Sequence, residues 1–451
     1  MNRGFHNRLV SLFVFLSTFL WIASFCACSN KVLDVEAEGQ AELADDDLSL
    51  SVKNSLVSEG SSKSAYPSSF KPDDKEYPYA GIPRVVIETE YRQVINDRET
   101  EIPAKLQIWG ECESESEIMD LTIRGRGYSS WDMKKKGYKI KFQKKQRMFG
   151  LSRDKEWNLI ANYADKSLLR NYITYKLSEW LEMPYSVKSV FVELYINSVY
   201  YGVYQFTENV KVSDERVCLP KDGSSFLFEK EPDANDGSLY IRTKYGTEYK
   251  IRYPKEPVKS NLDSLINYIG KVEDYLRRDE DGKDSLDYYL NVESFVPFYW
   301  IQEFTKNNDA AASRSLFYTW SLGGVINFGP VWDFDVAYGN KPQESMQNAE
   351  DWYIRPRGWY KYIFKEETVR QKVLKFWKKK RNVFVHVNDS IDCYAKQLSM
   401  ATENEFKRWN IEQQSVYANQ NLVFKEYNEA VNALKLWINK RIEWIDDNFE
   451  K

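Results

Sequence analysis

The stretch NNDAAASRSLFYTWSLGGVINFGPVWDFD, residues 307–335, is where this chain is expected to fold back on itself. Two apolar runs, residues 315–320 and 325–328, lie on either side of the pair Gly323-Gly324. Apolar runs separated by two glycines are typical of a β-hairpin. The sequence therefore predicts a hairpin within this stretch.

Acidic residues stand at both ends of the predicted hairpin. Asp309 precedes its first strand, and Asp333 and Asp335 follow its second. Because a hairpin brings its two ends together, the three carboxylates are predicted to share one edge. Carboxylates placed in this way suit a divalent metal ion with a base beside it.

The composition limits which other groups can carry a reaction. The chain has 451 residues, 43% of them hydrophobic, which is enough for one large core or two lobes. Its only histidines are His6 and His386, and the first lies in the N-terminal leader, so a serine-hydrolase triad or a histidine-rich metal site is not expected. The net charge of −4 gives no overall attraction for nucleic acid. Carboxylates, lysines and arginines must therefore carry any catalysis.

The N-terminus is predicted to be a lipoprotein signal peptide, residues 1–28. Basic residues precede an apolar run at 9–27, and Cys28 follows a small residue, as in a bacterial lipobox. Cys26 is the weaker candidate for lipidation because a bulky residue precedes it, and a transmembrane anchor is the alternative. Lipid on Cys28 would attach the protein to the bacterial cell envelope, at the outer membrane or the cell surface. Residues 29–80, acidic and rich in serine, are predicted to be a disordered tether.

The first part of the body is predicted to be rich in β-strands. A strand at 121–124 runs into Arg124, Gly125 and Gly127. Alternating glycines and arginines after a strand can bring backbone amides and guanidinium groups to phosphate oxygens, although a plain hairpin turn explains them equally well. Lys139 and Lys141 then share one face of the next strand.

The remaining pattern predicts an α+β protein with a β-rich first half and a helical second half. The expected elements of the first half are strands at 84–89 and 105–109, a helix at 165–181, a hairpin at 189–208 and a strand at 225–231. Those of the second half are helices at 258–278, 286–305, 364–385, 387–408 and 420–448. The acids of the hairpin are expected to line a cleft between the two halves.

Several motifs, in order along the chain, resemble the CotH family of atypical protein kinases, which is named for spore-coat kinases. They cover about residues 80–400, and together they are far more specific than any one alone. They are RGRGYSSW at 124–131, KGYKIKF at 136–142, WNLIANY at 157–163, DKSLLRN at 165–171, the hairpin at 192–204 with Glu208, NND at 307–309 and GPVWDFD at 329–335.

This resemblance implies a divergent, two-lobed protein-kinase-like fold for residues 81–451. The β-rich N-lobe would span about 81–230 and the helical C-lobe about 231–451. The residues agree in one independent respect, because protein kinases also place a catalytic Asp, a hairpin and a metal-binding Asp in that order.

The resemblance also implies roles for the acids. Asp309 and Asp333 would be catalytic: Asp309 would orient the substrate hydroxyl or accept its proton, and Asp333 would hold Mg²⁺ or Mn²⁺ that bridges the phosphates of ATP. Asp335 would be a second metal contact. Arg124 and the amides of residues 125–127 would cover the phosphates.

A lysine should contact the phosphates and pair with an acid. Lys141 is the first choice because it follows the glycine loop on a strand, and Lys139 is the alternative. Glu208 and Glu179 are both available as the acidic partner.

The chain departs from the protein-kinase pattern at three points. Arg314 stands five residues after Asp309, where kinases have a metal-binding Asn, and Asp335 stands in place of the Gly of Asp-Phe-Gly. There is also no His-Arg-Asp sequence. These departures concern the second metal site and any switch of the usual kinase type.

The leading functional hypothesis is transfer of the ATP γ-phosphoryl group to Ser or Thr hydroxyls of exported proteins. The alternative is a non-catalytic cell-surface adhesion or glycan-binding lipoprotein on the same fold, which would use the high aromatic content of 15%. Carboxylate-based glycoside hydrolysis is a third hypothesis, and the motifs give it little support.

Overall fold

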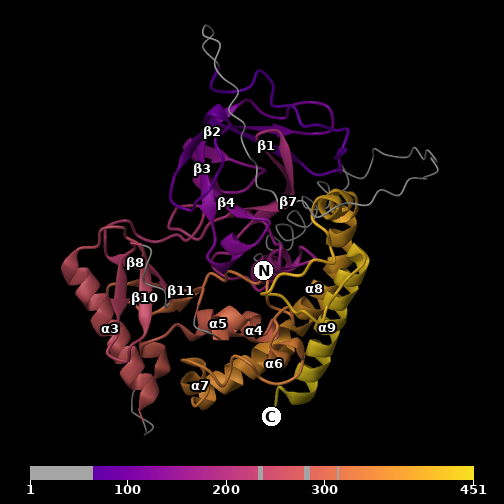
Figure 1. The fold of residues 1–451 in the computed structure, drawn as a ribbon. Helices are drawn as coiled ribbons and strands as arrows, with labels where there is room; N and C mark the ends of the chain where they lie inside the picture. Colours follow the sequence, from indigo (N-terminus) through magenta and orange to yellow (C-terminus); the bar gives the residue numbers. More distant parts are fainter. Residues whose placement is uncertain (1–63, 232–236, 279–284, 312–313, 451) are drawn as a thin grey trace, which may run out of the picture. The chain divides into compact units, whose positions relative to one another are not determined.

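The computed structural model describes residues 64–231, 237–278, 285–311 and 314–450 (Figure 1). The predicted signal peptide, Cys28 and residues 29–63 of the predicted tether lie outside these ranges. In the part of the chain that the structure describes, no helix is both long and apolar enough to span a membrane.

The last residues of the predicted tether, 64–80, pack against the folded body. Phe70 is 4% exposed and lies in a cluster with Val86, Tyr195 and Tyr200. Ordered structure therefore begins before residue 81, because the aromatic residues in this polar stretch have apolar surface to bury.

Seven strands close into a barrel in the first half of the body (indigo to magenta in Figure 1). Every neighbouring pair is antiparallel except β1 and β6, which are parallel. Apolar residues alternate along these strands and fill the interior, as in β2. The barrel order is β1-β2-β3-β4-β5-β7-β6, with β1 Arg84–Thr89, β2 Ile102–Trp109, β3 Met119–Arg126, β4 Gly137–Arg147, β5 Arg153–Ile160, β6 Ser189–Ile196 and β7 Val199–Glu208.

The predicted hairpin at 189–208 is formed by β6 and β7. Its two-residue turn, Asn197 and Ser198, has positive φ angles of 52° and 66°, as a hairpin turn of this length requires.

A second sheet of five strands lies in the second half of the body and contains the hairpin that opened the sequence. That hairpin is confirmed: β11 and β12 are antiparallel, and Gly323 in the turn has φ of 79°. The predicted strand β8 pairs with β10 and β11, so it belongs to this sheet and not to the barrel. Strands β9 and β10 fall where no strand was predicted. The sheet order is β12-β11-β8-β10-β9, with β8 Ser225–Lys230, β9 Tyr240–Arg242, β10 Glu248–Tyr253, β11 Leu316–Ser321 and β12 Asn327–Phe328.

The described α-helices, α2 excepted, all lie after residue 258. They are α2 Arg170–Trp180, α3 Lys259–Arg277, α4 Val292–Phe304, α5 Asn308–Ala311, α6 Glu344–Gln347, α7 Tyr360–Ile363, α8 Glu367–Arg408 and α9 Tyr427–Asn448, with 3₁₀ turns at Glu90–Arg92, Ser129–Asp132 and Leu286–Tyr288. The helices predicted at 364–385 and 387–408 form the single helix α8, because no Gly or Pro interrupts it and buried Phe384 and Val387 continue its apolar face. Helix α9 packs along α8 (Figure 1).

The prediction of an α+β protein is confirmed, with a sheet in each half. Most aromatic side chains lie in the two main hydrophobic clusters, one inside the barrel and one among the second sheet and the helices. The aromatic content of this chain is therefore largely a property of its core.

Candidate active site

The structure brings Asp309, Asp333 and Asp335 together. Asp309 lies on the short helix α5, and the other two follow β12. The pKa of Asp333 is raised well above its usual range by burial and by the charges of Asp335 and Asp309. Burial and Asp309 raise the pKa of Asp335 to about 6. All three side chains keep some solvent exposure, so a ligand can reach them.

Side-chain amides hold the loop that carries Asp333. The backbone of Asp333 is strained, with a φ angle of 68°. The Asn307 amide donates to the backbone oxygen of Asp333 at 3.3 Å. The Asn171 side-chain oxygen accepts from the backbone N–H of Phe334 at 2.7 Å. The Asn340 amide donates to the backbone oxygen of Asp335 at 2.8 Å. The loop of Asp333 and Asp335 is therefore held by two other segments, through Asn171 and Asn307, and by Asn340 five residues after Asp335.

A chain of buried amides connects this loop to the barrel. Asn171 donates to Asn162 at 3.0 Å, and Asn162 donates to Gln205 on β7 at 3.1 Å. All three residues are at most 4% exposed. The motifs at 157–163 and 165–171, which the sequence left without a role, thus support the Asp333 loop.

Replacing Asn171 with Ala should lower kcat for the reaction of this site about 10- to 100-fold, because the buried Phe334 N–H would lose its acceptor at a cost of about 1–3 kcal/mol. Steady-state kinetics on purified variants measure this. The matched control is Asn388→Ala, which removes an amide pair with Asn439 between α8 and α9, at 2.6 Å. Equal kcat values for the two variants would show that Asn171 does not position the loop.

Arg126, at the end of β3, is a cation beside the acids. Burial lowers the pKa of Arg126, and the carboxylate of Asp333 opposes that shift. Its guanidinium lies 5.7 Å from the ring centroid of Trp332. The hydroxyl of Tyr175 also faces Asp333, which helps burial to raise the pKa of that tyrosine. No separate role was predicted for Arg126 from the sequence, although this residue lies in the glycine loop.

Lys141 is not among the residues that the structure brings to the acids. It forms a 3.9 Å ion pair with Glu101 in which both side chains are more than 40% exposed. The alternative, Lys139, lies closer to the protein interior, 3.4 Å from Glu156, and burial lowers the pKa of Lys139. Lys139 is directly opposite Arg124 on the neighbouring strand. Lys139 is thus the lysine with a partly buried acidic partner.

Neither acid suggested as a partner for Lys141 is placed to serve it. Glu208 is fully buried and accepts from the Ser152 N–H at 2.9 Å, the Tyr185 hydroxyl at 2.9 Å and the Lys188 N–H at 3.2 Å. Glu208 thus connects the end of β7 to the residues that precede β5 and β6. Glu179 is on the surface, paired with Lys176 at 3.0 Å.

The glycine loop is shaped by packing as well as by any ligand. The Gly125 N–H already donates to the backbone oxygen of Asp97 at 2.9 Å, and a side chain at Gly125 would collide with Trp131. Gly127 has φ of 108°, which favours glycine. Arg124 donates to the backbone oxygen of Arg98. In this structure the plain-turn explanation accounts for both glycines.

Two further cations lie near Asp309. Burial raises the pKa of Asp309, and Lys341 and Arg314 oppose that shift. Arg314 also pairs with Glu231 at 3.7 Å and lies 5.9 Å from the ring centroid of Tyr128 in the glycine loop. The residue that replaces a metal-binding Asn therefore supplies positive charge beside the catalytic candidate.

A group of partly buried carboxylates at the end of a hairpin, with guanidinium and ammonium groups around it, is the arrangement that enzymes use for metal-assisted phosphoryl transfer. A family model described as CotH kinase protein matches residues 123–445, and the chain belongs to this family. The resemblance seen in the sequence is thus confirmed. A search of curated proteins found no match.

Membership in a kinase family implies ATP and a divalent metal ion. Within the described ranges, no three His, Cys, Asp or Glu side chains are grouped closely enough to hold a metal ion by themselves. Two neighbouring carboxylates do fit Mg²⁺ bound together with a nucleotide, because this ion is usually held by one or two carboxylates plus substrate phosphates. Asp333 and Asp335 are the residues that would hold it.

Proposed function

We propose that this protein is an atypical kinase that transfers the γ-phosphoryl group of ATP to Ser or Thr hydroxyls of exported proteins. The observation that supports it most is the convergence of Asp309, Asp333 and Asp335 beside Arg126 in a member of a kinase family. In this proposal the barrel acts as the N-lobe of a divergent kinase-like fold, and the second sheet with its helices acts as the C-lobe.

Asp309 and Asp333 have different tasks in this reaction. Asp309 orients the acceptor hydroxyl and takes its proton, and its raised pKa makes it a better base than an exposed Asp. Asp333, with Asp335, binds Mg²⁺ or Mn²⁺, which would neutralise charge on the phosphates. Such an ion would also relieve the repulsion between these carboxylates.

The phosphates of ATP meet cations from the barrel. Arg126 lies beside Asp333. Lys139, paired with Glu156, takes the phosphate-binding role that was first predicted for Lys141. Arg124 faces Lys139 across the strand pair. A guanidinium held beside buried carboxylates is suited to phosphate oxygens because it can bind two of them at once.

The protein would act outside the cytoplasm, in the bacterial cell envelope. The basic and apolar N-terminus with Cys28 supports attachment to the outer membrane or the cell surface through lipid. Mass spectrometry of the N-terminal peptide of the mature protein would test this directly, because a lipidated Cys28 has a characteristic mass.

The proposal is tested by nucleotide binding and phosphoryl transfer with purified protein. Radiolabelled ATP with Mg²⁺ or Mn²⁺ should label the protein or added protein substrates on Ser or Thr. If the protein neither binds ATP nor transfers phosphate with either ion, the kinase proposal fails.

The cations provide a matched pair of variants. Arg126→Ala should lower kcat/KM for phosphoryl transfer about 100-fold or more, because a charge beside the transferred group is lost. Lys141→Ala should change it less than about twofold, since Lys141 pairs with Glu101 at the surface. A large loss at Lys141 with none at Arg126 would reverse this assignment of the phosphate-binding cations.

A further inference from the structure

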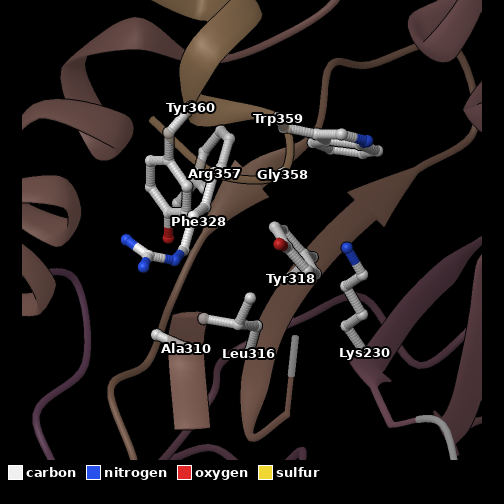
Figure 2. Close-up of a pocket in the computed structure, with 9 residues that line it drawn as sticks. All are labelled: Lys230, Ala310, Leu316, Tyr318, Phe328, Arg357, Gly358, Trp359 and Tyr360. Atoms are coloured by element: carbon white, nitrogen blue, oxygen red, sulfur yellow. The ribbon is translucent and has the colours of Figure 1, made fainter. Parts of the chain in front are cut away.

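A small pocket lies among α5, the second sheet and the segment that leads into α7 (Figure 2). Ala310, the residue after Asp309, forms part of its lining. Lys230 at the end of β8 and Tyr318 on β11 form another part, and residues 357–360 at the start of α7 complete it. Because consecutive Cα atoms are about 3.8 Å apart, this pocket lies within the reach of a substrate chain whose hydroxyl is at Asp309.

The pocket combines two cations with aromatic walls. Figure 2 shows Lys230 and Arg357 on opposite sides of Tyr318, with the Arg357 guanidinium near the hydroxyl end of Tyr360. Arg357 is anchored by its contact with Tyr353, whose ring centroid is 4.1 Å from the guanidinium carbon and whose backbone oxygen accepts one of its N–H groups. The guanidinium therefore has further N–H groups with which to bind a ligand.

One polar group in the pocket lacks a partner. Tyr360 is 5% exposed, and its buried hydroxyl makes no hydrogen bond. A buried hydroxyl without a partner costs about 1–3 kcal/mol unless a ligand or water satisfies it. Burial also lowers the pKa of Lys230 to about 8, a shift that the charge of Glu273 opposes. The pocket thus holds donors and positive charge that an anion would satisfy.

We propose that this pocket binds the side-chain carboxylate of an acidic residue that lies within a few positions of the Ser or Thr acceptor in the protein substrate. The proposal rests on the proposed kinase function. Arg357 and Lys230 attract the carboxylate, and the Tyr360 hydroxyl donates a hydrogen bond to it.

The test compares peptides that differ in one side chain. Fluorescence anisotropy measures binding of the full protein to Ser-containing peptides with Glu or Gln at each of the four positions on either side of the acceptor. At one or two positions the Glu peptide should bind about 10- to 100-fold more tightly than its Gln partner, the range for a buried charge-assisted contact. The Glu-to-Gln affinity ratio, not the absolute affinity, is the readout.

Variants of the pocket should remove this ratio. Arg357→Ala and Lys230→Met should bring it close to one, Arg357→Lys should retain part of it, and Arg357→Glu should favour a Lys-containing peptide. The matched control is Lys361→Ala, an exposed lysine on α7 that does not line the pocket, and it should keep the full ratio. Thermal unfolding of each variant identifies any that fail to fold, and the Arg357→Lys variant then carries the comparison.

The outcomes separate this proposal from the kinase proposal. Phosphoryl transfer without any Glu preference, or a preference that survives Arg357→Ala, overturns the carboxylate pocket and leaves the kinase proposal intact. A Glu preference that depends on Arg357 in a protein that transfers no phosphate supports the pocket and overturns the kinase activity. Preference for a phosphoserine peptide, with no discrimination between Glu and Gln peptides, also overturns the proposal of a carboxylate pocket.

Discussion

Replacing Asp333 with Asn should abolish phosphoryl transfer and at the same time make the unliganded protein more stable. The value of kcat should fall about 1,000-fold or more, which corresponds to a loss of several kcal/mol of transition-state stabilisation. The reason is that a carboxylate that would bind the metal ion is lost. The stability should rise because Asp333 is partly buried beside Asp335 and Asp309, whose charges repel it. A site that costs stability is expected where function requires like charges to converge.

The pH dependence gives the sign of the stability effect. The pKa values of Asp333 and Asp335 are raised in the folded protein, the latter to about 6. The folded state therefore binds more protons than the unfolded state between about pH 4 and these pKa values, and the free energy of unfolding falls as pH rises through that range. Asp333→Asn should reduce this fall, so its gain in stability should be larger at pH 7 than at pH 4.

Thermal unfolding with and without Mg²⁺ and ATP measures both effects. The nucleotide with Mg²⁺ should raise the midpoint of the wild-type protein and have less effect on Asp333→Asn. The matched control is Asp165→Asn, a fully buried acid already paired with Arg170, which should lower stability. If Asp333→Asn retains wild-type activity or destabilises the protein as Asp165→Asn does, Asp333 is a structural acid.

Replacing Glu303 with Ala should lower the free energy of unfolding by about 3–5 kcal/mol, the typical cost of removing one partner of a buried ion pair. Glu303 on α4 and Arg441 on α9 are both fully buried, with 2.9 Å between Oε1 and Nη2. Glu303 also accepts from the backbone N–H groups of Tyr353 at 2.6 Å, Ile354 at 2.8 Å and Arg355 at 2.8 Å. The substitution removes the carboxylate partner of a buried guanidinium and the acceptor of three buried or partly buried backbone amides.

Urea unfolding of the variants measures this, with Glu293→Ala as the control on the same helix. Glu293 pairs with Lys372 at 3.0 Å, but its side chain is 82% exposed, so its loss should cost no more than about 1 kcal/mol. The double variant Glu303→Met, Arg441→Met should lose less than the single variant, because no charge remains buried alone. Similar losses for Glu303→Ala and Glu293→Ala would mean that the buried pair contributes little.

Local sequence patterns predicted the structural elements that depend on neighbouring residues, such as turns and amphipathic helices. The hairpin at 315–328 follows from two apolar runs and a Gly-Gly turn, and the structure contains it. The last helix, predicted at 420–448, lies at Tyr427–Asn448, and its apolar residues Val431, Leu434 and Ile445 are buried. The motifs also identified the kinase family, because their residues occur in the family's order.

Predictions that depended on distant partners needed the tertiary structure. Arg126 and Lys141 lie on neighbouring strands of one barrel, and nothing in their local spacing tells which one points towards Asp333, far along the chain. Strand β8 was predicted with the strands of the first half, yet its partners are β10 and β11 in the second sheet. Periodicity fixes which face of a strand is apolar, but it does not fix which neighbour that strand pairs with.

The three acids at the ends of the hairpin show both what local sequence determines and what tertiary packing determines. The sequence alone determined that Asp309, Asp333 and Asp335 flank one hairpin, because a turn is decided by its own residues. Only the tertiary structure decided that Asn171 and Asn307 hold the loop of Asp333 and that Arg126 lies beside it. Asn307 lies 26 positions from Asp333, and Asn171 lies 163 positions from Phe334. Such hydrogen bonds and charges depend on how the whole chain packs, and no local pattern records them.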